Sequence, residues 1–401
     1  MCASGRSLLC DGGCIPTAAE TWSVLSRSAI MLLYFAACLA PAFLISFVAT
    51  AAMRRLAPRW GLIDQPADRK MHTSPTPLGG GIGIWLGIVV PLALTQIVAL
   101  LLARTSELPG WFPAELEVLL DGVVYRSGQM WAIIVGGTVL AVMGLIDDVR
   151  DLPWLRRLLV QLAVAVALTM AGVRATLFVS IPWLGGAVTV LWILVLVNAF
   201  NFLDNMDGLS AGIGLIAAAM FAVVMLRMTS EPRWLVGGVL MVMVGSLAGF
   251  LCHNRAPARI FMGDSGSYFV GLLIASMTVL GTFYEKSASV SGPHVMLAPL
   301  CILAIPLYDF CSVMLIRLRQ GRSPFHADKS HFSHRLVELG LRPSHAVLTI
   351  YLATLTTGLG ALLLYEVKGW AGAWLVVALI GCVLAVVAIL ETVGRGRNGD
   401  S

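Results

Sequence analysis

The sequence predicts an all-α, polytopic integral membrane protein with about eleven transmembrane helices. Of its 401 residues, 58% are hydrophobic and only 12% are charged, and a mean hydropathy of +0.87 is far too high for a soluble protein. A helix needs roughly 20 apolar residues to cross the ~30 Å hydrocarbon core of a bilayer. Eleven apolar stretches approach this length: 29–53, 81–102, 131–146, 158–173, 187–202, 209–228, 235–252, 267–283, 295–316, 346–365 and 371–391.

The distribution of basic residues predicts the orientation. The loops on the side that holds residues 53–80, together with the C-terminal tail, carry 18 of the 27 Lys and Arg residues, and the other side carries nine. Loops rich in Lys and Arg face the cytoplasm. We therefore expect the N-terminus outside and the C-terminus in the cytoplasm.

Five polar segments end or interrupt the apolar stretches, and this topology places all of them on the cytoplasmic side. They hold almost every carboxylate and histidine at the edge of the membrane. Such clustering at one face favours chemistry there over conduction across the membrane. The segments are 61–81, 144–157, 198–208, 253–267 and 317–336.

The rest of the chain gives few functional signals. The net charge of +5 does not indicate a nucleic-acid partner, and the eight cysteines lack metal-type spacing. The expected organisation is a tail without fixed structure over 1–28, one transmembrane catalytic domain over 29–392 and a cytoplasmic tail over 393–401.

The first polar segment is a loop shaped by Pro and Gly, and it offers Arg69, Lys70 and His72. An ordinary loop beside the membrane also carries such residues. In the second segment, Asp147 and Asp148 end an apolar stretch. Adjacent carboxylates repel unless a cation compensates them, so they indicate either a divalent ion, a bound Lys or Arg, or a solvated helix end.

The third segment places Asn198, Asn201, Asp204 and Asp207 at intervals of three, so for as long as the helix continues they form a slowly drifting line on one of its faces. Four oxygen-bearing side chains on one line suit a hard cation or a polar ligand. A polar stripe that only holds helices together is the alternative.

In the fourth segment, Asp264 lies between Gly263 and Gly266 at the start of an apolar stretch. The flanking glycines allow close approach of a ligand, and a helix start favours phosphate. Asp264 could equally serve as the N-cap of that helix. The fifth segment is a cationic flap suited to pyrophosphate. After Gly321 it carries Arg322, His326, Lys329, His331, His334 and Arg335, opposed only by Asp328.

Together, in order and spacing from about Gly61 to Leu336, these segments resemble the polyprenyl-phosphate N-acetylhexosamine-1-phosphate transferases. Members of this family transfer a sugar 1-phosphate from a UDP-sugar to undecaprenyl or another polyprenyl phosphate, release UMP and require Mg²⁺ or Mn²⁺. The resemblance implies these substrates, a multi-pass position in the bacterial cytoplasmic (inner) membrane and an active site on the cytoplasmic face. It leaves a homodimer open.

The resemblance also implies residue roles. Asp264 and Asn201 match the metal ligands, and Asp147 and Asp148 match the paired aspartates that position or deprotonate the lipid phosphate. Uracil contacts match Phe261, as a stacking ring, and Asp207. Phosphate-binding roles fall on Lys70, Arg157, His331 and His334. The remaining expected site residues are Asp204, for catalysis, and Asn198, Lys329 and Arg335, for substrate binding.

One departure bears on the sugar. Ser333 stands where the N-acetylglucosamine branch commonly has a second histidine, and the consecutive histidines typical of enzymes that use UDP-MurNAc-pentapeptide are absent. UDP-GlcNAc is therefore the favoured donor, with UDP-MurNAc-pentapeptide as the alternative. Direct displacement is the favoured mechanism, although a covalent phospho-aspartate on Asp148 or Asp204 stays open.

Two other classes of protein fit the sequence less well. An ion-coupled transporter predicts charges at the bilayer midplane and inverted repeats, and the sequence shows neither. An intramembrane aspartyl protease is suggested by Tyr308-Asp309 and Gly263-Asp264, but these motifs come in the wrong order and Phe261 replaces the required glycine. Asp309 is expected to be a structural carboxylate or one that supports a site residue.

Overall fold

The computed structural model describes residues 18–66, 74–105, 110, 120, 122–175, 182–229, 232–281, 292–323 and 331–398. The chain separates into two compact units, Met1–Ala37 and Cys38–Ser401, and α1 (Ala18–Leu56) continues through the boundary. The structure does not test the predicted tails; α1 begins at Ala18 and α14 ends at Asn398. All contacts described below lie within the second unit.

The described residues confirm an all-α fold. Their one sheet is a short antiparallel pair in which Ile63 of β1 (Ile63–Asp64) faces Pro77 of β2 (Thr76–Pro77). The remaining elements are η1 (Ala57–Trp60), α2 (Gly80–Leu102), α4 (Ser127–Arg150), α5 (Trp154–Met170), α6 (Pro182–Leu203), α7 (Leu209–Val223), the π-helical turn η2 (Val224–Met228), α8 (Trp234–Asn254), α9 (Gly263–Leu280), η3 (Pro293–Leu297), α10 (Ala298–Ile302), α11 (Ala304–Arg319), α12 (Phe332–Glu338), α13 (Pro343–Glu366) and α14 (Gly369–Asn398).

Most predicted spans correspond to helices of membrane-crossing length. Nine helices of the described ranges are long and apolar enough to cross a membrane, and a tenth span results if the bent pair η3–α10 and α11 crosses once. The remaining predicted span, 158–173, falls on α5, which has 17 residues. A helix of this length extends about 26 Å, at the lower limit for a crossing.

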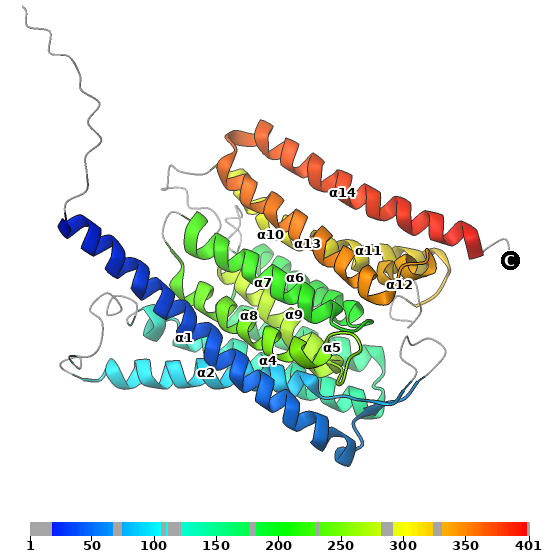
Figure 1. Ribbon diagram of the computed structural model, residues 1–401, viewed down its shortest axis with the longest axis horizontal. Coiled ribbons are helices and arrows are strands. Elements are labelled where there is room, and N and C mark those ends of the chain that lie inside the picture. The colour runs from blue at the N-terminus through cyan, green and yellow to red at the C-terminus, as the bar shows by residue number, and fades with distance from the viewer. Residues whose placement is uncertain are drawn as a thin grey trace, which may run out of the picture. The chain divides into compact units, whose positions relative to one another are not determined.

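Helix α9 forms the centre of this unit. It packs against α2, α4, α6 and α7, and Figure 1 shows it enclosed by the neighbouring helices, with α13 and α14 on one side. Two glycines allow its first turn to be approached closely: a Cβ at Gly81 of α2 or at Gly144 of α4 would lie 2.3 or 2.4 Å from backbone atoms of α9. Small residues at such contacts are typical of helix packing in membranes.

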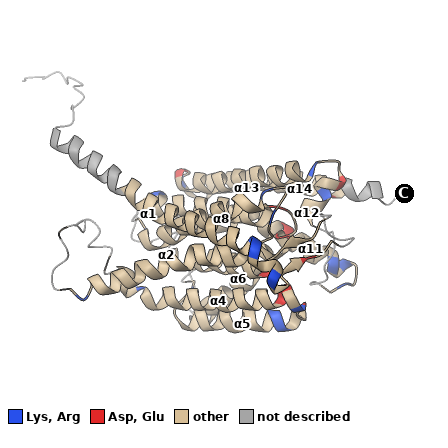
Figure 2. Ribbon diagram, turned by 60° about the horizontal axis from the view of Figure 1, so that its bottom comes forward, with Lys and Arg blue, Asp and Glu red and all other residues tan. Residues whose placement is uncertain are grey.

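The charged residues gather at one end of these helices. Figure 2 shows Lys, Arg, Asp and Glu concentrated near α11, α12 and the adjoining ends of α4, α5 and α6. At this end α2 and α9 begin, and α4, α6 and α11 end, so the five polar segments come together there. The predicted clustering at one end is confirmed for the described residues.

Candidate active site

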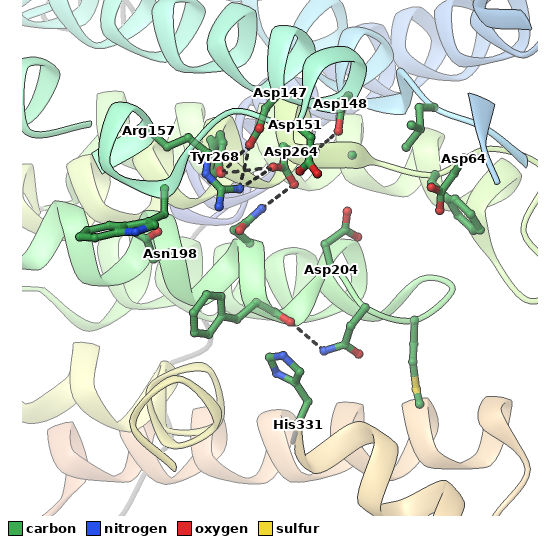
Figure 3. Close-up of a pocket in the computed structure, with 18 of the residues that line it drawn as sticks. Asp64, Asp147, Asp148, Asp151, Arg157, Asn198, Asp204, Asp264, Tyr268 and His331 are labelled. Carbon is green, nitrogen blue, oxygen red and sulfur yellow. Dashed lines mark hydrogen bonds and ion pairs between the residues drawn. The ribbon is translucent and has the colours of Figure 1, made fainter. Parts of the chain in front are cut away.

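A cavity of about 630 Å³ opens at the charged end, and every one of the five polar segments contributes to its wall. Figure 3 shows Asp147, Asp148, Asp151 and Asp264 on one side of the cavity and His331 on the opposite side, with Asp204 between them. Among the described residues its lining includes seven aspartates and two arginines: Asp64, Asp147, Asp148, Asp151, Asp204, Asp207, Asp264, Arg157 and Arg317. Such an excess of carboxylates favours the binding of a cation.

Arg157 joins two carboxylates from different helices. Its Nη1 donates to Asp147 Oδ2 at 2.9 Å and lies 3.5 Å from Asp264 Oδ2. Asp147 also accepts the backbone N–H of Leu152 at 2.6 Å, and the Tyr268 hydroxyl donates to Asp264 Oδ2 at 3.2 Å. Asp147 is therefore held by the protein itself, which suits an anchoring role for this carboxylate.

The two predicted metal ligands lie next to each other. Asn201, near the end of α6, donates from Nδ2 to Asp264 Oδ1 at 2.7 Å and to the Ser267 hydroxyl at 3.2 Å. Asp148 approaches the same turn from α4, because its Oδ1 accepts the backbone N–H of Asp264 at 2.9 Å. Its other oxygen, Oδ2, is buried without a hydrogen-bond partner among the described residues.

Asp204 follows the last residue of α6 and lines the same cavity. Burial and, to a smaller extent, the negative charge of Asp148 raise its pKa to about 8, although a hydrogen bond from the backbone of Gly263 opposes the shift. In the absence of a cation, the protonated carboxyl is therefore the favoured form of Asp204 near neutral pH.

The other members of the third segment are partly committed to local structure. Asn198 lines the cavity, and its Nδ2 donates to Gln161 Oε1 at 2.7 Å and to the Leu194 carbonyl at 2.8 Å. Asp207 Oδ2 accepts the backbone N–H of Ala258 at 2.9 Å, which fixes the loop before Phe261. Phe261 and Asp207 both line the cavity, as their predicted contacts to a nucleobase require.

The predicted basic site residues of the cationic flap and of the first polar segment are only partly described. His331 and His334 line the cavity, whereas Lys70 and Lys329 lie outside the described residues. Arg335 is not among the lining residues, and its Nη1 donates to Glu338 Oε2 at 2.8 Å. Side chains three apart share a helix face, which explains this local pairing.

The donor chemistry fits a hard divalent cation. Among the described residues, no group of three or more His, Cys, Asp or Glu forms a ready-made metal site. Mg²⁺, however, is commonly bound through one or two carboxylates together with substrate phosphates. The unpartnered Asp148 Oδ2 and the adjacent pair of Asp264 and Asn201 supply oxygen ligands of this kind.

Tyr268, Asp64 and Arg317 are among the lining residues to which the sequence analysis assigns no role. Tyr268 lies one turn after Asp264, and that spacing was the available signal for its contact. Asp64 and Arg317 belong to polar segments that the sequence identified, but neither was assigned a role. Arg317 is 2% exposed and its guanidinium lies 4.8 Å from the centre of the Phe202 ring, a position that sequence spacing does not reveal.

The sequence is similar to a family model and to known proteins. Residues 130–282 match the family model described as Glycosyl transferase family 4. A probable undecaprenyl-phosphate N-acetylglucosaminyl 1-phosphate transferase of Bacillus subtilis is 32% identical, covering 84% of this chain and 88% of the relative. The decaprenyl-phosphate N-acetylglucosaminephosphotransferase of Mycobacterium tuberculosis is 33% identical over 90% and 88% of the two chains. The undecaprenyl-phosphate alpha-N-acetylglucosaminyl 1-phosphate transferase of Escherichia coli is 26% identical over 78% and 79%.

Proposed function

The chain belongs to glycosyl transferase family 4, and we propose that it transfers N-acetylglucosamine 1-phosphate from a UDP-sugar to a polyprenyl phosphate, releasing UMP. The observation that carries this proposal is sequence identity of 32% and 33%, over 84% and 90% of the chain, to two relatives named as polyprenyl-phosphate N-acetylglucosamine-1-phosphate transferases. The relatives do not favour UDP-MurNAc-pentapeptide as the donor, or transport as the function.

The cavity supports a reaction between two phosphates. An oxygen of the lipid phosphate attacks the phosphorus that carries the sugar, and the bond from that phosphorus to the bridging oxygen breaks, with its electron pair leaving on UMP. Phosphoryl transfer of this kind depends mainly on positioning and on neutralising charge. We favour direct displacement, because a phosphate monoester with a second pKa of about 6 is already largely a dianion at neutral pH and needs no obligatory base. A covalent route through Asp148 or Asp204 is the alternative.

Asp264 and Asn201 would hold a divalent ion, Mg²⁺ or Mn²⁺, with the unpartnered oxygen of Asp148 close by. When bound, such an ion neutralises phosphate charge and polarises the diphosphate. Arg157 keeps Asp147 and Asp264 together and limits their repulsion. Phe261 and Asp207 are the proposed uracil contacts.

The basic residues complete the proposed site. His334 contributes from α12 and His331 from the residue before it. Lys70 remains a predicted phosphate-binding residue, and Lys329 a predicted substrate-binding residue. The bias of Lys and Arg supports a cytoplasmic position for the cavity in a bacterial inner membrane. The UDP-sugar reaches this side from the cytoplasm, and the lipid phosphate approaches from the bilayer.

The formation of the lipid product tests this proposal. Purified protein with undecaprenyl phosphate, Mg²⁺ and radiolabelled UDP-GlcNAc should move the label into an organic-extractable lipid. Asp264→Asn should abolish this transfer, whereas Glu391→Gln should not, because Glu391 is a buried carboxylate outside the cavity lining. Retained transfer in Asp264→Asn would refute the metal assignment.

A further inference from the structure

Asp309 is a buried carboxylate that the reaction described above does not use. It lies in α11, is 3% exposed, and accepts two hydrogen bonds from the start of α12. Its Oδ2 is 2.9 Å from His331 Nδ1, and its Oδ1 accepts the backbone N–H of Phe332 at 2.9 Å. Because a buried carboxylate is costly unless hydrogen-bonded, this arrangement fixes the residue.

The pairing decides which nitrogen of His331 faces the cavity. With a proton on Nδ1 donated to Asp309, the ring exchanges its other proton only at Nε2. His331 lines the cavity, and Figure 3 shows it on the opposite side from the aspartates of α4 and α9. The ring of Phe202 meets the imidazole edge-on at 5.7 Å, which restricts its rotation.

We propose that Asp309 is a positioning residue that holds His331 with Nδ1 protonated and with Nε2 available to a phosphate oxygen in the cavity. This inference rests on the proposed function. In the protonated ring, Nε2–H can donate to an anionic phosphate, and the carboxylate compensates the charge from behind. Charged or titratable groups near the pair include His334, 6.2 Å from His331 between ring centres, and Arg317, whose guanidinium lies 4.8 Å from the centre of the Phe202 ring.

If Asp309 served only to hold the start of α12 in place, the substitution Asp309→Asn would have a different effect. An asparagine at position 309 still accepts the Phe332 N–H, so the start of α12 keeps its hydrogen bond. Its amide group then faces Nδ1 as a donor, which selects the opposite tautomer of His331. Asp309→Asn therefore separates the orientation of the imidazole from the docking of α12.

Glu391 offers a matched control. It is also a buried carboxylate, 4% exposed, and it accepts a hydrogen bond at 2.8 Å from Tyr308, the residue before Asp309. It does not line the cavity. Glu391→Gln removes a carboxylate charge that contacts Tyr308 and is buried to a similar extent as Asp309. It changes no contact of His331 described above.

The kinetic test is a double-mutant cycle. Asp309→Asn should lower kcat about tenfold or more, with less than a threefold change in the KM for UDP-GlcNAc, and Glu391→Gln should leave both unchanged. His331→Ala should lower kcat. Adding Asp309→Asn to it should have little further effect, because Asp309 is proposed to act only through the imidazole of His331. Wild-type kcat in Asp309→Asn, or losses that multiply in the double variant, would overturn the proposal.

A second measurement needs no turnover and no variant at position 309. The chain has seven histidines, so ¹⁵N-histidine NMR, with the signal assigned by its loss in His331→Gln, reports the protonation of each ring nitrogen. A protonated Nδ1 is expected, and an unprotonated Nδ1 would refute the pairing. A protonated Nδ1 in a protein that transfers no sugar phosphate would instead refute the proposed function.

Discussion

Gly144 provides the most direct test of the packing that builds the site. It lies in α4, one turn before Asp148, where a Cβ would come within 2.4 Å of Asp264 C and Ser265 N in α9. Carbon atoms in contact need about 3.5 Å, so Gly144→Ala requires α4 and α9 to separate by about 1 Å. Separation of this size would break the 2.9 Å bond from Asp264 N to Asp148 Oδ1.

The expected loss in activity is larger than the loss in stability. Overpacking costs roughly 1–3 kcal/mol, whereas a misplacement of about 1 Å at a reacting centre can cost about 100-fold in rate. Initial rates of UMP release and thermal unfolding in detergent measure the two effects on the same preparation. Gly381→Ala is the matched control, because nothing lies within 4 Å of its added Cβ in α14. If Gly144→Ala kept the wild-type kcat, the close approach of α4 to α9 would not be needed for the site.

Three further predictions concern charge and hydrogen bonding at the cavity. Because the pKa of Asp204 is raised to about 8, its contribution to the stability of the metal-free protein should be complete below the ordinary carboxyl pKa and lost as the pH rises through 8. Unfolding in EDTA from pH 6 to 9 should show this loss, and Asp204→Asn should make the profile flatter. Arg157→Met should destabilise the protein by about 1–3 kcal/mol, and Asp147→Asn should reduce that cost in the double variant; additive costs in equilibrium unfolding would contradict the ion pair. Ser333→Ala removes the 2.7 Å bond to Asn205 Oδ1 and should cost about 0.5–1.5 kcal/mol, measured in the same way, and an unchanged stability would contradict a contribution from this bond.

The sequence predicts where the helices begin and end better than it predicts which helices pack against one another. Runs of apolar residues and the polar segments between them identify the spans. Successive spans run in opposite directions through the membrane, which is why the five polar segments are predicted to lie at the same face. Which helices lie side by side is harder to predict, because a helix such as α9 is buried on nearly all faces and shows no apolar stripe. Its central position depends on glycines in α2 and α4 that fit against it.

The predicted site residues show the same division. Asn198, Asn201, Asp204 and Asp207 all line the cavity, but α6 ends at Leu203, so helical spacing accounts only for Asn198 and Asn201. The contact of Asn201 with Asp264 joins residues that are 63 apart in sequence, and only the resemblance to a family paired them. Arg335 is instead paired with Glu338, since a nearby carboxylate on the same helix face competes for a cation.

The central claim is tested most directly by UMP release from the purified protein. The assay supplies undecaprenyl phosphate and Mg²⁺ with UDP-GlcNAc, UDP-GalNAc or UDP-MurNAc-pentapeptide in separate reactions, and EDTA as the control. Release that requires UDP-GlcNAc, lipid and metal together is the predicted result. No release with any donor, or release that persists in EDTA, would contradict the proposed metal-dependent transfer of N-acetylglucosamine 1-phosphate.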